Sequence, residues 1–323
     1  MSALLSMLGH EVHGISHEAL HESHFFLANV QRFLASDSQI DIRDSESLNL
    51  GISNVKPDVV VHLAAQALVR EGYRKPYETF ETNVSGTINV IKACQESQVP
   101  NLLVVTSDKV YQGSRNIKFY SEDDALGGKD PYSASKAAAD IVTQSLAQLS
   151  TSTRISIVRA GNVIGGGDFG HERLIPDLYR AQKSKSPATI RFPNAVRPWQ
   201  HVLDCLAAYI RIIDHMIKTE TFGIWNVGPI TKQTISVKSI CQKTAEYFGN
   251  AEIFQEVEKV EEGMNENPFL QLDASRIHRE LGWSPKMDTF QAVEWTLDWY
   301  KSAINGESPS NRTEEQINRY YEL

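Results

Sequence analysis

The sequence has few cysteines, no long apolar run and no cluster of positive charge. Its 3 cysteines, Cys94, Cys205 and Cys241, lie far apart without a CxxC pair. This spacing favours reduced core thiols over a disulfide framework or zinc site, and we expect no metal. The longest apolar stretches, at residues 59–61 and 102–105, are strand-sized and far too short to span a membrane.

Charge argues against a nucleic-acid partner. The 323 residues include 40 acidic and 32 basic side chains, a formal net charge of -8, and no run of lysine or arginine to gather phosphates. The amino-terminal residues also lack a basic leader, and Ser2, Ser6 and His10 interrupt their apolar side chains. We therefore predict no signal peptide and expect a cytoplasmic chain.

Strand-like and helix-like segments alternate through the first half of the chain. Strands are predicted at residues 11–15, 59–63, 101–106 and 154–159, and helices at 4–8, 83–95 and 133–149. Repeated strand-then-helix units are typical of a Rossmann-type doubly wound parallel sheet, here expected as a first domain over residues 1–163. The rhythm breaks after Gly161, so residues 164–323 are predicted to form mainly a smaller α/β lobe, with some segments returning to the first domain.

Two polar clusters carry the strongest chemical signal. Tyr132 and Lys136 stand four residues apart on a predicted helix, where a lysine charge can lower the pKa of a phenol and make it a proton acceptor. A YxxxK pattern alone also fits an exposed tyrosine beside a solvated lysine. The polar run at residues 106–109 ends a predicted strand one sheet unit earlier, where ligands bind in open parallel sheets, and this favours a site.

Several motifs together resemble a known family. They are YSASK at residues 132–136, TSDKVY at 106–111, HLAAQ at 62–66, TNVSGT at 82–87, RAGNVIGGGD at 159–168, RLIPD at 173–177 and RPWQHVLD at 197–204. Their combination resembles the extended short-chain dehydrogenase/reductases of the NAD-dependent epimerase/dehydratase family, and within these the CDP-glucose 4,6-dehydratases. The resemblance implies a lyase that converts CDP-glucose to CDP-4-keto-6-deoxyglucose with tightly held NAD. It also implies a homodimer or dimer of dimers and a place in lipopolysaccharide O-antigen biosynthesis.

The resemblance assigns residues to the cofactor and the substrate. Asp41 and Ile42 would hold the adenine. The remaining NAD-binding residues would be Leu63, Ala64, Ala65, Gln66, Asn83, Tyr132, Lys136 and Ala160. The sugar nucleotide would meet Asn162, Arg173, Leu174 and Arg197, whose fork-shaped guanidinium groups suit a diphosphate. A surface ion pair for either arginine and a turn for Asn162 are the alternatives.

The catalytic roles also follow from the resemblance. Tyr132 would accept the proton of the sugar 4-hydroxyl through Ser107, and Lys136 would hold the nicotinamide ribose. Protonated Asp108 would donate to the departing 6-hydroxyl, and Lys109 would remove the C5 proton if it is neutral. A charged Lys109 that only supports Asp108 or the enolate is the alternative.

Two other functions compete with the dehydratase. A nucleotide-sugar 4-epimerase would share Tyr132 and Lys136 but has no need of an acid for water loss. A non-catalytic sugar-nucleotide-binding fragment is the other alternative, because the first strand and the glycine loop of the Rossmann pattern are missing before residues 2–8. We expect either that Met1 is not the true start or that NAD binding is impaired. Glu18 is a poor match for the acidic residue that binds the adenosine ribose in this pattern.

Three further features are predicted to be structural. His62 on its strand is expected to be a hydrogen-bonded core residue. The glycines at 165–167 lack the GxGxxG spacing of a phosphate loop and are predicted to form a flexible loop on the substrate side. Trp225, Trp283 and Trp295 are expected to lie in the core.

Overall fold

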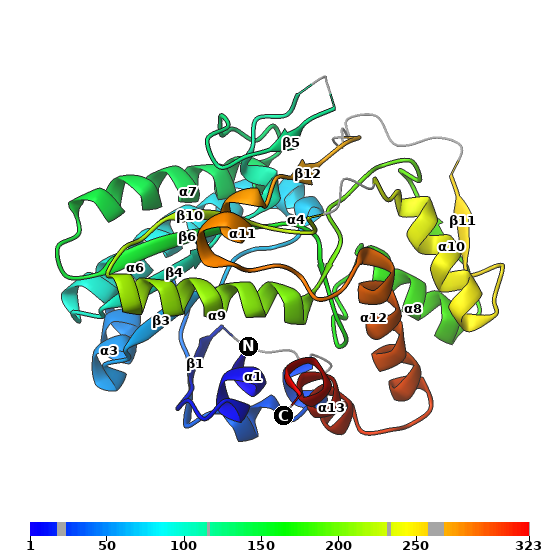
Figure 1. Cartoon of the computed structure of the whole chain (residues 1–323), viewed down its shortest axis with the longest axis horizontal. Coiled ribbons are helices and arrows are strands. Elements are labelled where there is room, and N and C mark those ends of the chain that lie inside the picture. The colour runs from blue at the N-terminus through cyan, green and yellow to red at the C-terminus, as the bar shows by residue number, and fades with distance from the viewer. Residues whose placement is uncertain (18–23, 115–116, 231–233, 258–267, 323) are drawn as a thin grey trace.

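The computed structural model describes residues 1–17, 24–114, 117–230, 234–257 and 268–322 (Figure 1). Its helices are α1 Ser2–Met7, α2 His24–Leu27, α3 Ser45–Val55, α4 Val69–Arg74, α5 Pro76–Phe80, α6 Gly86–Glu96, α7 Pro131–Leu149, α8 Leu174–Ser184, α9 Val202–Thr219, α10 Val237–Phe248, α11 Ser275–Leu281, α12 Thr289–Ile304 and α13 Pro309–Tyr321. Its strands are β1 His13–Ser16, β2 Ser36–Gln39, β3 Val59–His62, β4 Asn101–Val105, β5 Phe119–Tyr120, β6 Arg154–Ala160, β7 Val163–Ile164, β8 Ala188–Ile190, β9 Gln200–His201, β10 Ile224–Val227, β11 Phe254–Glu256 and β12 Gln271–Leu272.

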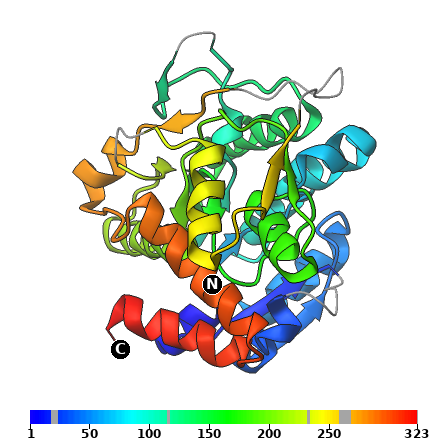
Figure 2. The same cartoon turned by 90° about the vertical axis from the view of Figure 1, so that its right-hand side faces the viewer.

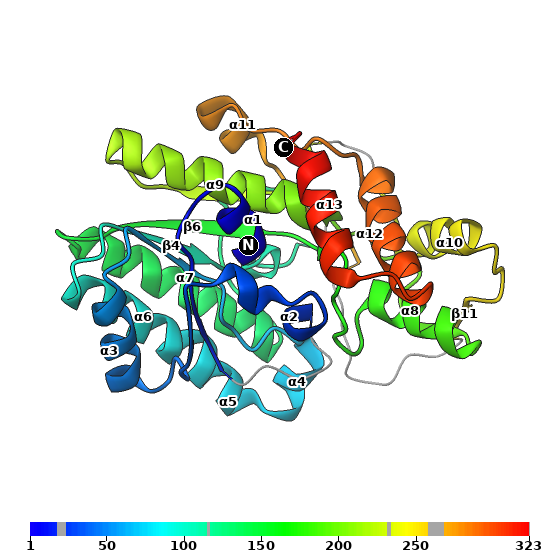
Figure 3. The same ribbon diagram turned by 90° about the horizontal axis from the view of Figure 1, so that it is seen from below.

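A parallel sheet in the order β10-β6-β4-β3 forms the centre of the molecule. Its side chains alternate between two faces, as the period of a strand requires. Leu103 and Val158 pack with α1 and α9 on one face, while Leu102, Val104 and Ile155 pack with α3 and α6 on the other. Figure 3 shows α9 on one side of the sheet and α3, α6 and α7 on the other. The predicted strands at 59–63, 101–106 and 154–159 and the helices at 83–95 and 133–149 are confirmed within a few residues.

The strands β1 and β2 form a separate parallel pair. The predicted strand at 11–15 is present but begins at His13, while β2 was missed because its residues, Ser36 to Gln39, include no apolar side chain. β3 is the edge strand of the central sheet. In the described part of the chain no strand pairs with its free edge, although the Rossmann pattern expects one there, between β3 and β1 in space. The three valines of β3 are therefore only half-buried.

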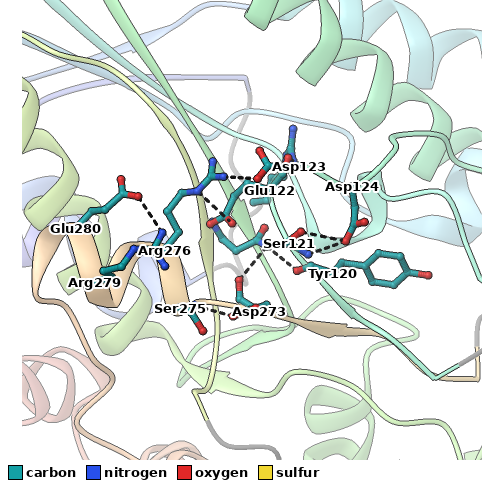
Figure 4. Close-up of polar contacts among 12 residues, drawn as sticks. Tyr120, Ser121, Glu122, Asp123, Asp124, Asp273, Ser275, Arg276, Arg279 and Glu280 are labelled. Carbon is teal, nitrogen blue, oxygen red and sulfur yellow. Dashed lines mark hydrogen bonds and ion pairs between the residues drawn. The ribbon is translucent and has the colours of Figure 1, made fainter.

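The second lobe has a core of its own, built from α8, α10, α12 and the short strand β8 (Figure 2). Other late segments return to the first half. The strand β10 extends the central sheet beside β6, and α9 covers the sheet. The helix α11 places Arg276 against Glu122 and Asp123, as Figure 4 shows. The division at residue 163 stays a prediction.

The glycines at 165–167 are required by close packing. A Cβ on Gly165 would stand 2.5 Å from Cγ1 of Val202, and one on Gly166 would stand 2.0 Å from Cγ of Trp299. Gly167 has a φ of 81°, a left-handed conformation that favours glycine. The loop therefore lies against α9 and α12, which the expectation of a flexible loop did not foresee.

We predict that Gly166→Ala destabilises the protein strongly. The added methyl overlaps the indole of the buried Trp299, and overpacking of this kind costs about 3 kcal/mol or more. Urea unfolding measures the loss. Gly228→Ala is the matched control, because a Cβ there has no neighbour closer than 3.7 Å. Equal midpoints for the two variants would contradict the prediction.

Candidate active site

The helix α7 carries Tyr132 and Lys136 at its amino-terminal end. The Asp130 carboxylate accepts a hydrogen bond from the backbone N–H of Ser133 at 2.9 Å, and Pro131 occupies the first turn. This start places both functional side chains in the first two turns of the helix, where they are buried. The predicted juxtaposition of Tyr132 and Lys136 on one helix is confirmed.

The residues after β4 meet α7 at the carboxyl end of the sheet. The Ser107 hydroxyl donates to Oδ1 of Asp108 at 3.1 Å and accepts from the backbone N–H of Lys109 at 3.1 Å. The same serine is close enough to the phenol of Tyr132 to lower its pKa. Ser107 thus links the proposed base to the proposed acid, and the two predicted clusters form one site.

Asp108 is buried in a way that favours its protonated form. Among the described residues its Oδ2 has no hydrogen-bond partner. Burial raises the pKa of Asp108 above its usual value, although the charges of Lys109 and Arg197 and the hydrogen bond from Ser107 act in the opposite direction. The carboxyl is therefore suited to hold a proton and give it away.

Burial is also the largest effect on the Tyr132 phenol and raises its pKa to about 12. Ser107 and the charge of Arg173 lower this pKa, while the charges of Asp108 and Asp130 raise it. Arg173 is thus the cation with the largest effect on the phenol, whereas Lys136 was expected in that role. The Lys136 ammonium instead donates to the Val105 carbonyl at 3.1 Å.

Asn83 fixes the loop that follows β3. Its side-chain carbonyl accepts from the Gln66 N–H at 2.8 Å, and its amide donates to the Gln66 carbonyl and to the Ser135 hydroxyl. Ala65 is half-buried and Leu63 and Ala64 are exposed at this carboxyl end of the sheet. The predicted residues of the 63–66 loop and α7 are therefore brought together.

The other predicted cofactor residues surround the same edge. Asp41 pairs with Arg43, with Nη2 and Oδ2 2.6 Å apart, and the pKa of Asp41 is lowered by this hydrogen bond. Ile42 is buried, and its side chain lies where a Cβ on Gly86 would stand. Ala160 ends β6 beside Val227 of β10. Glu18, the poor match for the ribose acid, lies outside the described residues.

The predicted substrate residues fall into two environments. Arg173 is half-buried and pairs with Asp168, a partner that the sequence analysis missed, at 3.0 Å from both carboxylate oxygens. Arg197 is buried and close enough to Asp108 to lower the pKa of its carboxyl. Leu174 is the first residue of α8, and the Asn162 carbonyl accepts from the Gln200 N–H at 3.1 Å. Arg173, whose side chain is 41% exposed, thus forms an ion pair of the kind considered as the alternative, whereas Arg197 is buried.

Two buried histidines lie beside the site. His62 is a core residue, as predicted, with its Nε2 3.0 Å from the Thr87 hydroxyl. His201 caps α9 by accepting from the Leu203 N–H at 3.2 Å. Burial lowers the pKa of each to about 3, and the charge of Lys136 adds to the effect on His62. Both imidazoles are therefore neutral in the folded protein.

We predict that these histidines make the protein lose stability as the pH falls. Below pH 6.5 the unfolded chain protonates them while the folded protein does not, so the unfolded state binds more protons. Each contributes a slope approaching about 1.4 kcal/mol per pH unit. His201→Asn keeps a capping acceptor, and urea unfolding between pH 7 and about pH 5 should show a shallower slope for this variant. An unchanged slope would contradict the prediction.

Comparison with known proteins places the chain in a family. The model of the NAD dependent epimerase/dehydratase family matches residues 1–228. The chain belongs to this family. It is 34% identical over 295 residues to CDP-glucose 4,6-dehydratase of Salmonella typhimurium, an alignment that covers 87% of this chain and 80% of that protein. It is 28% identical over 282 residues to dTDP-glucose 4,6-dehydratase of Neisseria gonorrhoeae, covering 81% of this chain and 80% of the relative.

Solved structures of family members share the fold. UDP-glucose-4-epimerase from Stenotrophomonas maltophila, with bound NAD and formylated UDP-arabinopyranose, superposes with a TM-score of 0.81 at 22% identity, over 94% of this chain and 95% of that one. A dTDP-glucose 4,6-dehydratase from Streptomyces venezuelae, with NAD and TYD bound, has a TM-score of 0.80 at 23% identity, over 96% and 93% of the two chains. The Rossmann-type α/β fold predicted from the sequence is therefore confirmed.

The residues around Lys136 fit a nicotinamide cofactor. An ammonium has three donors, and the described residues supply Lys136 with one acceptor, the Val105 carbonyl. Burial of the charge lowers the pKa of Lys136 to about 8, and the carboxylate of Asp140 raises it. A ribose offers the hydroxyl oxygens that such a buried ammonium needs. The cofactor would be held by Lys136 at its nicotinamide ribose, by the exposed apolar residues Leu63 and Ala64, and by Asp41 at its adenine.

The described residues lack a membrane-spanning helix and a cluster of metal-binding side chains. None of the helices they form has the length and apolar character needed to cross a membrane. They also contain no group of three or more histidine, cysteine, aspartate or glutamate side chains arranged to bind a metal ion.

Proposed function

We propose that this protein is a nucleotide-sugar 4,6-dehydratase that uses NAD and converts CDP-glucose to CDP-4-keto-6-deoxyglucose. The observation that carries the proposal is the buried Asp108, which is placed next to Tyr132 through Ser107 and favours its protonated form. An oxidation at C4 requires a base, and loss of water from C5 and C6 requires an acid as well. The site offers both in one group of neighbouring side chains.

The first half of the reaction uses Tyr132. When bound, NAD would take the hydride from C4 of the sugar and return it to C6 after water has left, which makes C6 a methyl group and leaves the cofactor unchanged. Tyr132 accepts the proton of the 4-hydroxyl through Ser107, and it must be ionised to do so. Ser107 and Arg173 lower the pKa of the phenol and so favour the ionised form against the effect of burial. Arg173 therefore has a second role besides binding the diphosphate.

The second half uses Asp108 and Lys109. A ketone at C4 acidifies the C5 hydrogen, and we assign the removal of this hydrogen as a proton to Lys109. The C5 electron pair forms a double bond to C6 while Asp108 donates its proton to the departing 6-hydroxyl, which leaves as water. Asp108 then carries the charge that Lys109 and Arg197 stabilise.

The epimerase alternative uses only the first half of this chemistry. A 4-epimerase returns hydrogen to C4 and removes no hydroxyl. A protonated carboxyl at the site therefore has no role in that reaction. Asp108 therefore favours the dehydratase, as does the 34% identity to a CDP-glucose 4,6-dehydratase.

Turnover of a panel of nucleotide sugars tests the proposal. The protein with added NAD is incubated with CDP-glucose, dTDP-glucose and UDP-glucose, and the products are identified by NMR. We expect the 4-keto-6-deoxy product from CDP-glucose at a rate at least tenfold above the others, about 1.4 kcal/mol in the barrier. Binding of CDP-glucose without turnover would favour the non-catalytic role instead.

Three finer features stay predictions that follow from the family resemblance. They are assembly as a homodimer or dimer of dimers, a cytoplasmic location and a place in lipopolysaccharide O-antigen biosynthesis. Size-exclusion chromatography with light scattering tests the first of these directly.

A further inference from the structure

Asp140 and Arg159 form a buried ion pair next to the residues of the proposed site. Asp140 follows Lys136 by one turn of α7, and its carboxylate pairs with the guanidinium of Arg159 on β6 at 2.8 Å. The side chains of Asp140 and Arg159 are 0% and 1% exposed, so both charges are fully removed from water. A buried pair is costly to desolvate, and satisfied hydrogen bonds are needed to offset that cost.

Asp140 accepts hydrogen bonds from three elements. Arg159 donates from Nε and Nη2 at 2.9 and 2.8 Å, the Thr106 hydroxyl donates at 2.9 Å, and Gln144 donates at 2.7 Å. The Thr106 contact is important because Thr106 directly precedes Ser107 and Asp108. The neighbouring Val105 carbonyl accepts from Lys136. Val105 and Thr106, at the end of β4, are thus hydrogen-bonded to Lys136 and Asp140, which lie one turn apart on α7.

Arg159 holds the other end of the same segment. Its Nη1 donates to the Tyr111 hydroxyl at 3.1 Å and to the Glu122 carbonyl at 2.9 Å. The Glu122 carboxylate accepts from the Asn226 N–H at 2.8 Å and pairs with Arg276 of α11 at 3.6 Å, the contact drawn in Figure 4. The ion pair therefore fixes both ends of the segment that carries Ser107, Asp108 and Lys109.

We infer that Asp140 and Arg159 are positioning residues of the reaction: they hold the catalytic segment against α7, and the Asp140 carboxylate keeps Lys136 positively charged. This inference rests on the proposed function for its effect on turnover. Its effect on Lys136 does not depend on which reaction the site performs.

The charges near Lys136 are few. Asp140 raises the pKa of Lys136, burial lowers it, and the net value is about 8. His62 is close enough for its own pKa to be lowered by the Lys136 charge, but it is neutral. Arg159 carries the opposite charge to Asp140 in their ion pair. Removing the Asp140 charge should therefore move the titration of Lys136 to lower pH.

The test follows the titration of Lys136 by NMR of ¹³C-labelled lysine, with the signal assigned by its loss in Lys136→Met. Asp140→Asn alone strands the Arg159 charge and endangers folding, so the double variant Asp140→Asn/Arg159→Gln is measured beside it. We expect the Lys136 midpoint to fall by about one pH unit or more in the double variant. The alkaline limb of kcat/KM for CDP-glucose should move with it.

Two control variants separate charge from positioning. Gln144→Leu removes one hydrogen bond to Asp140 but no charge and should leave the midpoint unchanged. Thr106→Val should also keep the midpoint but lower kcat about tenfold at constant KM, because only the tie to the catalytic segment is lost. A midpoint in the double variant within about 0.3 units of wild type would overturn the inference. A wild type without turnover of CDP-glucose would instead refute the proposed function, and the NMR titration would still decide the role of Asp140.

Discussion

Tyr132→Phe is expected to reduce turnover of CDP-glucose by about a thousandfold, within the range for loss of a general base. The phenol lies in a buried position against Ser107, and phenylalanine fills the same space without a proton acceptor. Because the loss falls on the transition state, kcat should fall while the affinity for CDP-glucose measured by calorimetry changes little.

Tyr77→Phe is the matched control for Tyr132. It removes the hydroxyl of a tyrosine that is 90% exposed on α5. Its kcat should equal that of wild type. A Tyr132→Phe enzyme that keeps more than about a tenth of wild-type kcat would rule out the phenol as the base, since the loss in barrier stabilisation would be below about 1.4 kcal/mol.

Asp108→Asn is expected to stall the reaction after C4 oxidation and to reduce product formation by about 10²–10⁴-fold. Asparagine retains the shape of the side chain but cannot donate a carboxylic acid proton to the 6-hydroxyl. The near-ultraviolet absorbance of reduced nicotinamide should therefore rise during a single turnover and persist. Rapid-mixing spectroscopy of the variant with NAD and CDP-glucose measures this signal.

Lys109→Met separates the two roles open to Lys109. If Lys109 is the C5 base, the variant should show the same stalled absorbance together with loss of solvent-deuterium exchange at C5. Exchange and turnover within about tenfold of wild type would assign Lys109 to electrostatic support of Asp108. Absence of the stalled signal in both variants would contradict the sequence of steps proposed for the site.

The sequence was most informative where local physics and tertiary structure agree. The helix α7 was predicted from the alternation of strand-like and helix-like segments, and in the structure it begins after the capping Asp130 and Pro131. The strand β4 was predicted because it is a buried run of apolar residues. Ser107, Asp108, Tyr132 and Lys136 could be brought together because strand ends and helix starts meet at one edge of a parallel sheet.

The remaining features depend on contacts distant in sequence. Strand β2 is polar and pairs only with β1, so no hydrophobic pattern marks it. The burial of Arg197 beside Asp108 and the pairing of Arg173 with Asp168 depend on how the second lobe packs against the first. The role of Asp140 had a visible signal, since it follows Lys136 at i+4, but its partner Arg159 is on another element.

The most direct test of the dehydratase assignment is the product that wild-type protein forms from CDP-glucose with NAD in deuterated water. We predict a sugar nucleotide that has lost one water, with a ketone at C4, a methyl group at C6 and deuterium at C5, as read by mass spectrometry and NMR. A product of unchanged mass that is epimeric at C4, without deuterium at C5, would contradict the account and identify the protein as an epimerase.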